Sequence, residues 1–268
     1  TPELLPALEG VNTGAAVAIR GELVASPASG QRWEVRAASI ILYGGADPET
    51  FQLQKKRHSD EFLRGIAHLR PRTNKYGAML RVRSEMALAV HDFFRARGFF
   101  HVHAPILTGS DCEGAGEMFR VSNLEAEAAA ALAPEARRDA EFFGRTAGLT
   151  VSGQLEAELM ALALGDVYTF GPTFRAENSN TPKHAAEFWM IEPEMAFADI
   201  IDDMDLAEAM VKHLVGHALS HCAKDLALFA NFVDKTLMPT LEGVLDKPFV
   251  RLPYAEAVAE LKKSGRAF

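Results

Sequence analysis

The sequence predicts an α+β fold in which an antiparallel sheet flanked by helices follows a partial β-barrel. Three observations predict it. Apolar residues alternate with polar ones near the N-terminus, two long segments carry apolar residues at three-and-four spacing, and two strands flank a polar loop in the second half of the chain. Its 268 residues, 48% of them apolar, are enough to bury a core in one large or two smaller domains.

Residues 1–56 are expected to form the partial barrel. Residues 17–24 read as strand and 26–30 as a turn, after which Trp33 and Val35 alternate with charged residues. About three strands fit this length, and such a sheet is marginal as a domain by itself. We therefore expect the remnant of a small barrel.

Residues 57–77 are interpreted as a basic linker. Nine of the chain's 28 basic residues lie in the 29 positions from Lys55 to Arg83, against two acidic residues. A solvated linker with a polar helix face and a surface that contacts RNA phosphates explain this cluster equally well. The net charge of −8 argues against a protein that coats nucleic acid without selectivity.

Residues 78–268 are expected to form the larger domain. It opens with an amphipathic helix at 78–97, for which Gly98 is a plausible stop. The next strand, 99–107, contains Pro105, and proline in a strand belongs at an edge or a bend.

Two further segments predict helices that act as scaffold, at 124–138 in a surface insertion and at 206–224. Three histidines recur every four residues along the second helix: His213, His217 and His221. They could be read as a metal stripe, but no further ligand stands at a matching spacing. We interpret them as a half-exposed helix edge and expect no metal there.

The sequence has no apolar run of the length that a membrane span needs, and its first residues lack the features of a signal peptide. Cys112 and Cys222 are too few for a disulfide framework, so both are expected to be free thiols. A soluble, cytoplasmic protein without a membrane partner is expected.

The most informative segment is a pair of strands, 166–177 and 187–197, joined by a polar loop at 178–183. Together they predict a long antiparallel hairpin. Because alternate side chains of a strand share a face, Arg175 and Glu177 are expected to point the same way.

The hairpin carries groups that suit a nucleotide and an anion. Arg175 offers a planar donor fork for a phosphate or carboxylate, Glu177 an acceptor for an amine, and Phe188 a ring face for a flat base. A cross-strand ion pair on an exposed hairpin is the alternative for Arg175 and Glu177.

The hairpin also resembles a known motif. FRAENSNT at 174–181, Lys183-His184 and EFWMIEPE at 187–194 resemble motif 2 of the class II aminoacyl-tRNA synthetases of the aspartate, asparagine and lysine subgroup, most of all the asparaginyl-tRNA synthetase family. The helix and the Pro105 strand resemble motif 1 of that family, which implies a homodimer interface at Pro105. The opening strands resemble the end of its OB-fold barrel, which binds the anticodon.

The resemblance implies roles in ATP binding. Arg175 would be the catalytic residue that contacts both the α-phosphate and the amino-acid carboxylate, Glu177 would meet the adenine amine, His184 the outer phosphates, and Phe188 the stacked adenine. Attack of a carboxylate on phosphorus brings two anions together, so a shared cation that positions both lowers the barrier.

The resemblance also implies an amino-acid site. Residues 110–117 resemble the family's mobile loop, in which Glu113 would meet the ammonium group, although a solvated loop acid is the alternative. Ser152 and Gln154 would line the amino-acid pocket at a strand-to-helix corner, or only cap the next helix.

The amino acid itself is expected to be asparagine. Aspartate enzymes of the subgroup usually carry a lysine at the position where this sequence has Ala157, and glutamates stand on either side of it. A neutral amide fits such a pocket better than a second carboxylate. Glu158 is the candidate acceptor for the asparagine NH2.

Motif 3 of the family is not found before Phe268, and the Mg²⁺ ligands of relatives lie in that later part. Residues 78–268 are therefore expected to be a partial class II catalytic domain with motifs 1 and 2, in a chain that covers about the first two thirds of an enzyme. This piece by itself is expected to bind nucleotide weakly.

The predicted function is activation of asparagine by ATP, with Mg²⁺, and its transfer to tRNA(Asn) by a homodimer. Three alternatives remain: an aspartate-tRNA ligase, a synthetase paralogue that works without tRNA, and a truncated module without catalytic activity.

Overall fold

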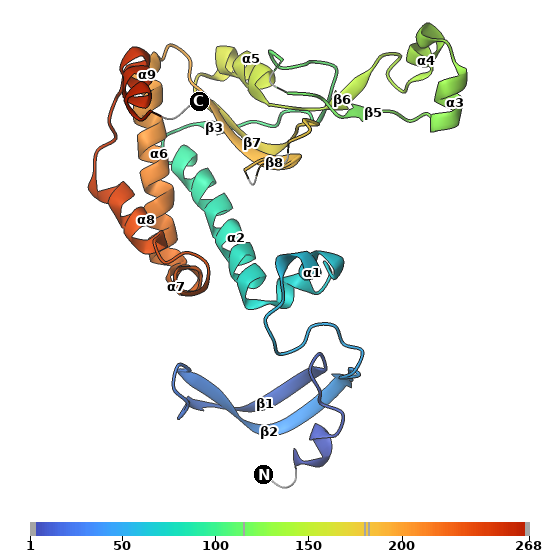
Figure 1. Ribbon diagram of the computed structural model, residues 1–268, viewed down its shortest axis with the longest axis vertical. Coiled ribbons are helices and arrows are strands. Elements are labelled where there is room, and N and C mark those ends of the chain that lie inside the picture. The colour runs from blue at the N-terminus through green and yellow to red at the C-terminus, as the bar shows by residue number, and fades with distance from the viewer. Residues whose placement is uncertain (1–3, 115, 180, 182, 266–268) are drawn as a thin grey trace. The chain divides into compact units, whose positions relative to one another are not determined.

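The computed structural model describes residues 4–114, 116–179, 181 and 183–265 (Figure 1). The chain divides into two compact units, Thr1–Leu80 and Arg81–Phe268. No helix of the described residues is long and apolar enough to cross a membrane.

The first unit contains one antiparallel β-ribbon, formed by β1 (Ala16–Ala25) and β2 (Trp33–Gly44). The register shifts after Arg20, and Gly21 lies so close to β2 that a Cβ atom there would be 2.2 Å from the Arg36 carbonyl oxygen. About three strands were expected, but residues 17–24 belong to a single strand. The described residues of this unit form a two-stranded ribbon, so a barrel stays a prediction.

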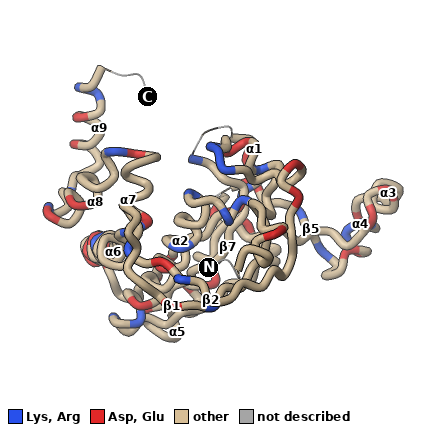
Figure 2. The backbone as a smooth tube through the Cα atoms, turned by 90° about the horizontal axis from the view of Figure 1, so that it is seen from below, with Lys and Arg blue, Asp and Glu red and all other residues tan. Residues whose placement is uncertain are grey.

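The segment interpreted as a linker is largely helical. After η2 (Pro6–Leu8) and the ribbon, α1 (Asp60–Gly65) and η3 (Arg70–Arg72) follow, and the Ser59 hydroxyl caps α1 by accepting from the Phe62 N–H at 3.2 Å. Both signs of charge occur around α1 in Figure 2. The Lys75 ammonium lies 2.7 Å from the Asp60 carboxylate.

The second unit is built on two small sheets (Figure 1). The first has the order β3-β7-β8, with β3 parallel to β7 and β7 antiparallel to β8; its strands are β3 (Phe100–His101), β7 (Val167–Phe174) and β8 (Glu187–Glu194). The second is antiparallel with the order β4-β6-β5; its strands are β4 (Leu107–Thr108), β5 (Arg120–Val121) and β6 (Ala147–Leu149). The predicted hairpin is confirmed as β7 and β8.

The described helices from α2 onward are α2 (Asn74–Arg95), α3 (Ala126–Ala131), α4 (Pro134–Ala140), α5 (Gln154–Leu164), α6 (Ile200–His221), α7 (Ala223–Phe232), α8 (Leu237–Asp246) and α9 (Tyr254–Lys263). The three predicted helical segments are confirmed as α2, the α3–α4 pair and α6. Helix α6 begins earlier than the predicted 206–224 segment, because the Asp199 side chain caps it and the Asp202 side chain completes a capping box.

Helix α2 ends as predicted at Gly98, which adopts φ 83°. The Gly98 N–H donates to the Arg95 carbonyl at 3.1 Å, and the Phe99 N–H donates to the Phe94 carbonyl at 3.1 Å. These two bonds form a Schellman motif, in which glycine tolerates the left-handed conformation. The turn brings Phe99 back onto Phe94, with 5.2 Å between the ring centroids.

Aromatic residues of α2 and β7 form the main core. The Phe93 and Phe94 side chains are fully buried, and the Phe94 ring stacks on Tyr168 at 4.3 Å. Apolar residues of α6 pack against this cluster: Leu206, Ala209, Met210 and Leu214. Helices α2 and α6 thus support the sheet that carries the hairpin.

The histidine edge of α6 faces α2. The His217 ring stacks on His221 at 4.0 Å, and its Nε2 atom lies 3.3 Å from the Glu85 carboxylate. His213 packs against Phe93. The described residues contain no group of three or more His, Cys, Asp or Glu that could hold a metal ion.

Candidate active site at the β7–β8 hairpin

Arg175 follows the last residue of β7, and its backbone N–H continues the ladder by donating to the Ala186 carbonyl at 3.0 Å. Its guanidinium lies 5.5 Å from the centre of the Phe188 ring, and one terminal nitrogen lies 3.5 Å from the Val151 carbonyl oxygen. Its Nε atom is buried and has no hydrogen-bond partner among the described residues. The alternative of an ion pair at Arg175 has no support in the described contacts, so donors remain for an anion.

Glu177 shares its surroundings with Arg175. A Cβ atom built on Gly116 would lie 3.0 Å from Arg175 Cδ and 3.0 Å from Glu177 Oε1, so both side chains flank this glycine. The Ala176 N–H donates to the Glu117 carbonyl at 2.7 Å. The loop at 110–117 therefore lies against the end of β7. The sequence alone did not predict this contact. Residue 115 lies outside the described part of the loop.

The same loop reaches the start of α5. The Cys112 thiol is 3% exposed and lies 3.7 Å from the Gln154 side-chain oxygen. Glu113, the next residue, is exposed and has φ 51°. Its contact with an ammonium group stays a prediction. Both cysteines are buried and unpaired, as expected.

Gln154 and Glu158 lie one turn apart on α5 and contact each other. The Gln154 amide nitrogen donates to the Glu158 carboxylate at 2.9 Å. This pair presents an amide and a carboxylate at the place where the sequence predicted recognition of a side-chain amide. The roles of both residues stay predictions.

Ser152 is 6% exposed, and its hydroxyl is used within the protein. The hydroxyl donates to the Glu192 carboxylate and accepts from the Gln154 backbone N–H at 3.1 Å. Both contacts hold the strand-to-helix corner before α5. A structural role at this corner was the alternative to substrate contact for Ser152. Contact of Ser152 with the amino acid is still a prediction.

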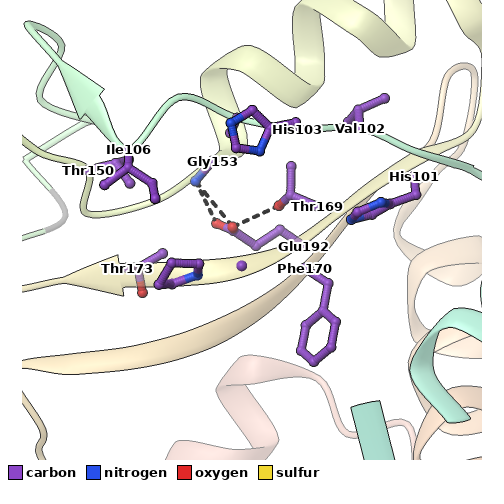
Figure 3. A pocket seen from close by; sticks show the side chains of 13 residues that line it. His101, Val102, His103, Ile106, Thr150, Gly153, Thr169, Phe170, Thr173 and Glu192 are labelled. Atoms are coloured by element: carbon purple, nitrogen blue, oxygen red, sulfur yellow. Dashed lines mark hydrogen bonds between the residues drawn. The ribbon is translucent and has the colours of Figure 1, made fainter. Parts of the chain in front are cut away.

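Glu192 is the functional candidate that sequence reasoning missed. It lies on β8 opposite Thr169 and projects toward the corner before α5, as the dashed lines in Figure 3 show. The cavity drawn there, of about 60 Å³, is lined by this carboxylate and by residues of the strand after α2 and of β7, among them His101, His103 and Thr173. The available signal was its place in EFWMIEPE. Because alternate side chains of a strand share a face, Glu192 is expected on the same face as Phe188 and Met190.

Glu194, two residues further on, has a raised pKa. Burial, and then the negative charges of Glu158, Glu192 and Asp203, raise its pKa from 4.5 to about 7. Glu158 therefore belongs to a region of negative potential. Such a region disfavours a ligand that brings a further carboxylate into it.

Two predicted residues lie apart from these contacts. His184 is exposed, and its ring contacts the Thr181 hydroxyl. The loop prediction for 178–183 includes Asn180 and Pro182, which lie outside the described residues. Pro105 is exposed, between β3 and β4, and lines a different hollow together with Phe143. The expected phosphate contact of His184 and the dimer contact of Pro105 stay predictions.

Residues 59–267 match the family model of class II tRNA synthetases for aspartate, lysine and asparagine, written D, K and N. The match covers well over half of the chain, so the chain belongs to this class of synthetases. The resemblance seen in the hairpin is thereby confirmed.

Within the class, curated relatives of high identity are asparagine–tRNA ligases. The chain is 67% identical over 256 residues to the asparagine–tRNA ligase of Oleidesulfovibrio alaskensis, covering 96% of the chain and 56% of that protein. It is 57% identical over 267 residues to that of Syntrophobacter fumaroxidans, covering 100% of the chain and 57% of that protein. The chain thus spans about half the length of the curated relatives it matches.

A solved structure of an asparaginyl-tRNA synthetase has a similar fold. The fold matches asparaginyl-tRNA synthetase from Pyrococcus horikoshii complexed with asparaginyl-adenylate with a TM-score of 0.78 and 27% identity, over 95% of this chain and 53% of that one.

Proposed function

We propose that the full-length protein activates asparagine with ATP and transfers the asparaginyl group to tRNA(Asn). The observation that carries the proposal is the position of Arg175, which flanks Gly116 together with Glu177 and lies 5.5 Å from the centre of the Phe188 ring, in a chain whose curated relatives include asparagine–tRNA ligases. These residues supply a cation for the phosphate and the carboxylate, a hydrogen-bond acceptor for the adenine amine and an aromatic ring for the adenine base.

In the proposed reaction, a carboxylate oxygen of asparagine attacks the α-phosphorus of ATP. A new phosphorus–oxygen bond forms, and the bond to the β-phosphate oxygen breaks with release of pyrophosphate. Arg175 holds the attacking carboxylate and the α-phosphate together, which offsets their repulsion before the bond forms. Phe188 holds the adenine ring, Glu177 accepts from its amine, and His184 contacts the outer phosphates.

Magnesium enters this chemistry as the counter-ion of ATP phosphates. The described residues offer no group of three or more acidic, histidine or cysteine side chains that fits a metal.

Recognition of asparagine is assigned to the Gln154–Glu158 pair, with Glu113 for the substrate ammonium group. The Glu158 carboxylate can accept from the asparagine NH2, whereas an aspartate side chain would bring a further negative charge beside the Glu158, Glu192 and Glu194 carboxyls. The surroundings of Glu158 therefore favour the neutral substrate.

Two further parts of the proposal concern partners. The segment 57–77 and the ribbon β1–β2 are assigned to contact with tRNA, through their basic side chains and the resemblance to an anticodon-binding barrel. Pro105 is assigned to a homodimer interface. Sedimentation of the full-length protein and of a Pro105→Ala variant tests the second assignment.

The test of the activity is ATP–pyrophosphate exchange by the full-length protein with each amino acid in turn. Exchange stimulated by asparagine is expected, and exchange stimulated by aspartate alone would identify an aspartate enzyme instead. Charging of a tRNA(Asn) transcript then separates a tRNA ligase from a paralogue that works without tRNA.

A further inference from the structure

Two neighbouring aromatic rings, Phe142 and Phe143, are largely exposed to solvent. Their exposed fractions are 79% and 54%, and the rings meet edge to face with 4.9 Å between their centroids. They follow α4 in the arm of residues 120–149, which consists of β5, α3, α4 and β6 and extends outward from the rest of the second unit (Figures 1 and 2). Adjacent exposed apolar side chains often mark a surface on which another molecule docks.

The turn that carries the two rings is held in place by buried polar contacts. Glu141 is 6% exposed, and its carboxylate pairs with the Arg120 guanidinium and accepts from the Ser122 hydroxyl at 2.9 Å. The Phe142 N–H donates to the Asn123 side-chain oxygen at 2.8 Å. Because a buried carboxylate that loses its partners is costly, these contacts keep the turn in one conformation. The rings are therefore presented at fixed positions, which lowers the entropic cost of docking.

An apolar hollow of about 210 Å³ lies beside the rings. It is lined by Leu107 of β4, Val121 of β5 and Ala147 of β6, together with both rings. A projecting ring and a hollow thus share one surface. In a pair of copies related by a two-fold axis, such a surface is self-complementary, because the ring of each copy can enter the hollow of the other.

A second hollow, of about 370 Å³, continues this surface to Pro105. The two hollows share four lining residues: Leu107, Phe143, Arg145 and Ala147. Pro105 is the residue assigned above to the homodimer interface. The partner that covers Pro105 would therefore reach the two rings as well.

We propose that Phe142 and Phe143 dock against a second copy of this chain and anchor the homodimer. The inference rests on the proposed function, which places a homodimer interface at Pro105. It adds an aromatic anchor outside the segment that resembles motif 1, and it brings the arm of residues 120–149 into the interface.

The contact would also reach the candidate active site through β6. The Thr150 carbonyl, directly after β6, accepts from the Phe174 N–H at 2.9 Å, and Phe174 precedes Arg175. The Thr150 N–H donates to the Ile106 carbonyl at 2.8 Å. A second copy that fixes the arm thus also fixes the strand beside Arg175. Exchange activity should therefore fall when the protein is diluted until the dimer dissociates.

The test is sedimentation equilibrium of the full-length protein over a range of concentrations. The double variant Phe142→Ala/Phe143→Ala is compared with the wild type and with Phe232→Ala, whose ring is also 79% exposed but belongs to α7. Aromatic anchors commonly dominate the affinity of an interface, so the Kd of the dimer is expected to rise by about 30-fold or more in the double variant. Phe232→Ala should keep the wild-type Kd.

ATP–pyrophosphate exchange by the same proteins gives a second readout. The specific activity of the double variant should be low in dilute solution and recover as its concentration is raised. A double variant that dimerises with the wild-type Kd overturns the inference, and so does one whose specific activity stays low at concentrations where it is dimeric.

If the double variant does not fold, hydroxyl-radical footprinting of the wild type decides. Oxidation of Phe142 and Phe143 should slow at concentrations where the protein is dimeric, while oxidation of Phe232 stays constant. Equal rates at low and high concentration overturn the inference. Protection of the two rings by tRNA, without protection at high protein concentration, would assign the surface to RNA and overturn it too.

The outcomes for this inference and for the proposed function are separable. A wild type that remains monomeric at every concentration refutes the docking of the rings and the homodimer together. Asparagine-dependent exchange by that wild type would still support the activation reaction. A wild type that dimerises without such exchange would refute the activation reaction alone.

Discussion

The Arg175 guanidinium lies over the ring of Phe188, 5.5 Å from its centre, although Arg175 follows the end of β7 and Phe188 lies in β8. A cation and an aromatic face in this arrangement attract each other. The same two groups are those that the proposed reaction assigns to the phosphate and the adenine.

Replacing Phe188 by alanine should weaken ATP binding. Stacking of a base on an aromatic ring is worth about 1–3 kcal/mol, so the KM for ATP in the exchange reaction should rise by about 5-fold to 150-fold. Phe232→Ala serves as the control, because that ring is 79% exposed and lies outside the proposed site. An unchanged KM for ATP in Phe188→Ala would remove this ring from the adenine site.

A side chain at Gly116 should disturb the site. Alanine would place its Cβ atom 3.0 Å from both Arg175 Cδ and Glu177 Oε1, a distance at which the neighbours must move. We expect Gly116→Ala to lower kcat/KM for exchange by about tenfold, since misplaced catalytic groups cost about that much or more. Gly243→Ala, in α8 with no neighbouring atom within 4 Å, should leave it unchanged. Wild-type activity in both variants would mean that the loop does not rest on Arg175 during the reaction.

Stability should depend on pH through Glu194. Burial, together with nearby negative charges, raises its pKa to about 7 in the folded protein, against 4.5 as the ordinary value. Between these values the folded state binds more protons than the unfolded state, so this group makes the free energy of unfolding fall as pH rises from about 4.5 to 7. Glu194→Gln removes the charge and should raise the melting temperature more at pH 8 than at pH 5. Calorimetry that finds equal shifts at both pH values would contradict this assignment.

The end of α2 offers a test of the fold. Gly98 has φ 83°, where a Cβ atom costs about 1–2 kcal/mol. Gly98→Ala should therefore lower the free energy of unfolding by about 1 kcal/mol in urea titrations. Gly216→Ala, inside α6 with open space around it, should be neutral or stabilising. A stable Gly98→Ala variant would mean that the Schellman turn is not needed to end α2.

The hairpin could be predicted because its signals are local. Strand alternation and a polar loop define β7 and β8, and the residues Arg175, Glu177 and Phe188 lie within one short segment. The helical spacing of α2 and α6 is equally local, and Gly98 marks the end of the first.

Other features depend on residues far apart in the chain. Glu192 meets donors 23 and 40 residues earlier, so its position in a strand pattern could not show that it holds the corner before α5. The length of residues 1–56 left room for about three strands, whereas β1 and β2 are long strands that use much of it, and Gly21 lies within β1. In the structure it lets β1 approach the Arg36 carbonyl and continue.

The central claim, that Arg175 joins the acid group of asparagine to the reacting phosphate, is tested most directly by calorimetric titration of the full-length protein with a non-hydrolysable asparaginyl-adenylate analogue. The wild type is expected to bind it more tightly than the aspartyl analogue, and Arg175→Ala is expected to weaken binding by about 100-fold, or about 2.7 kcal/mol. Equal affinity of the wild type and Arg175→Ala would contradict the account.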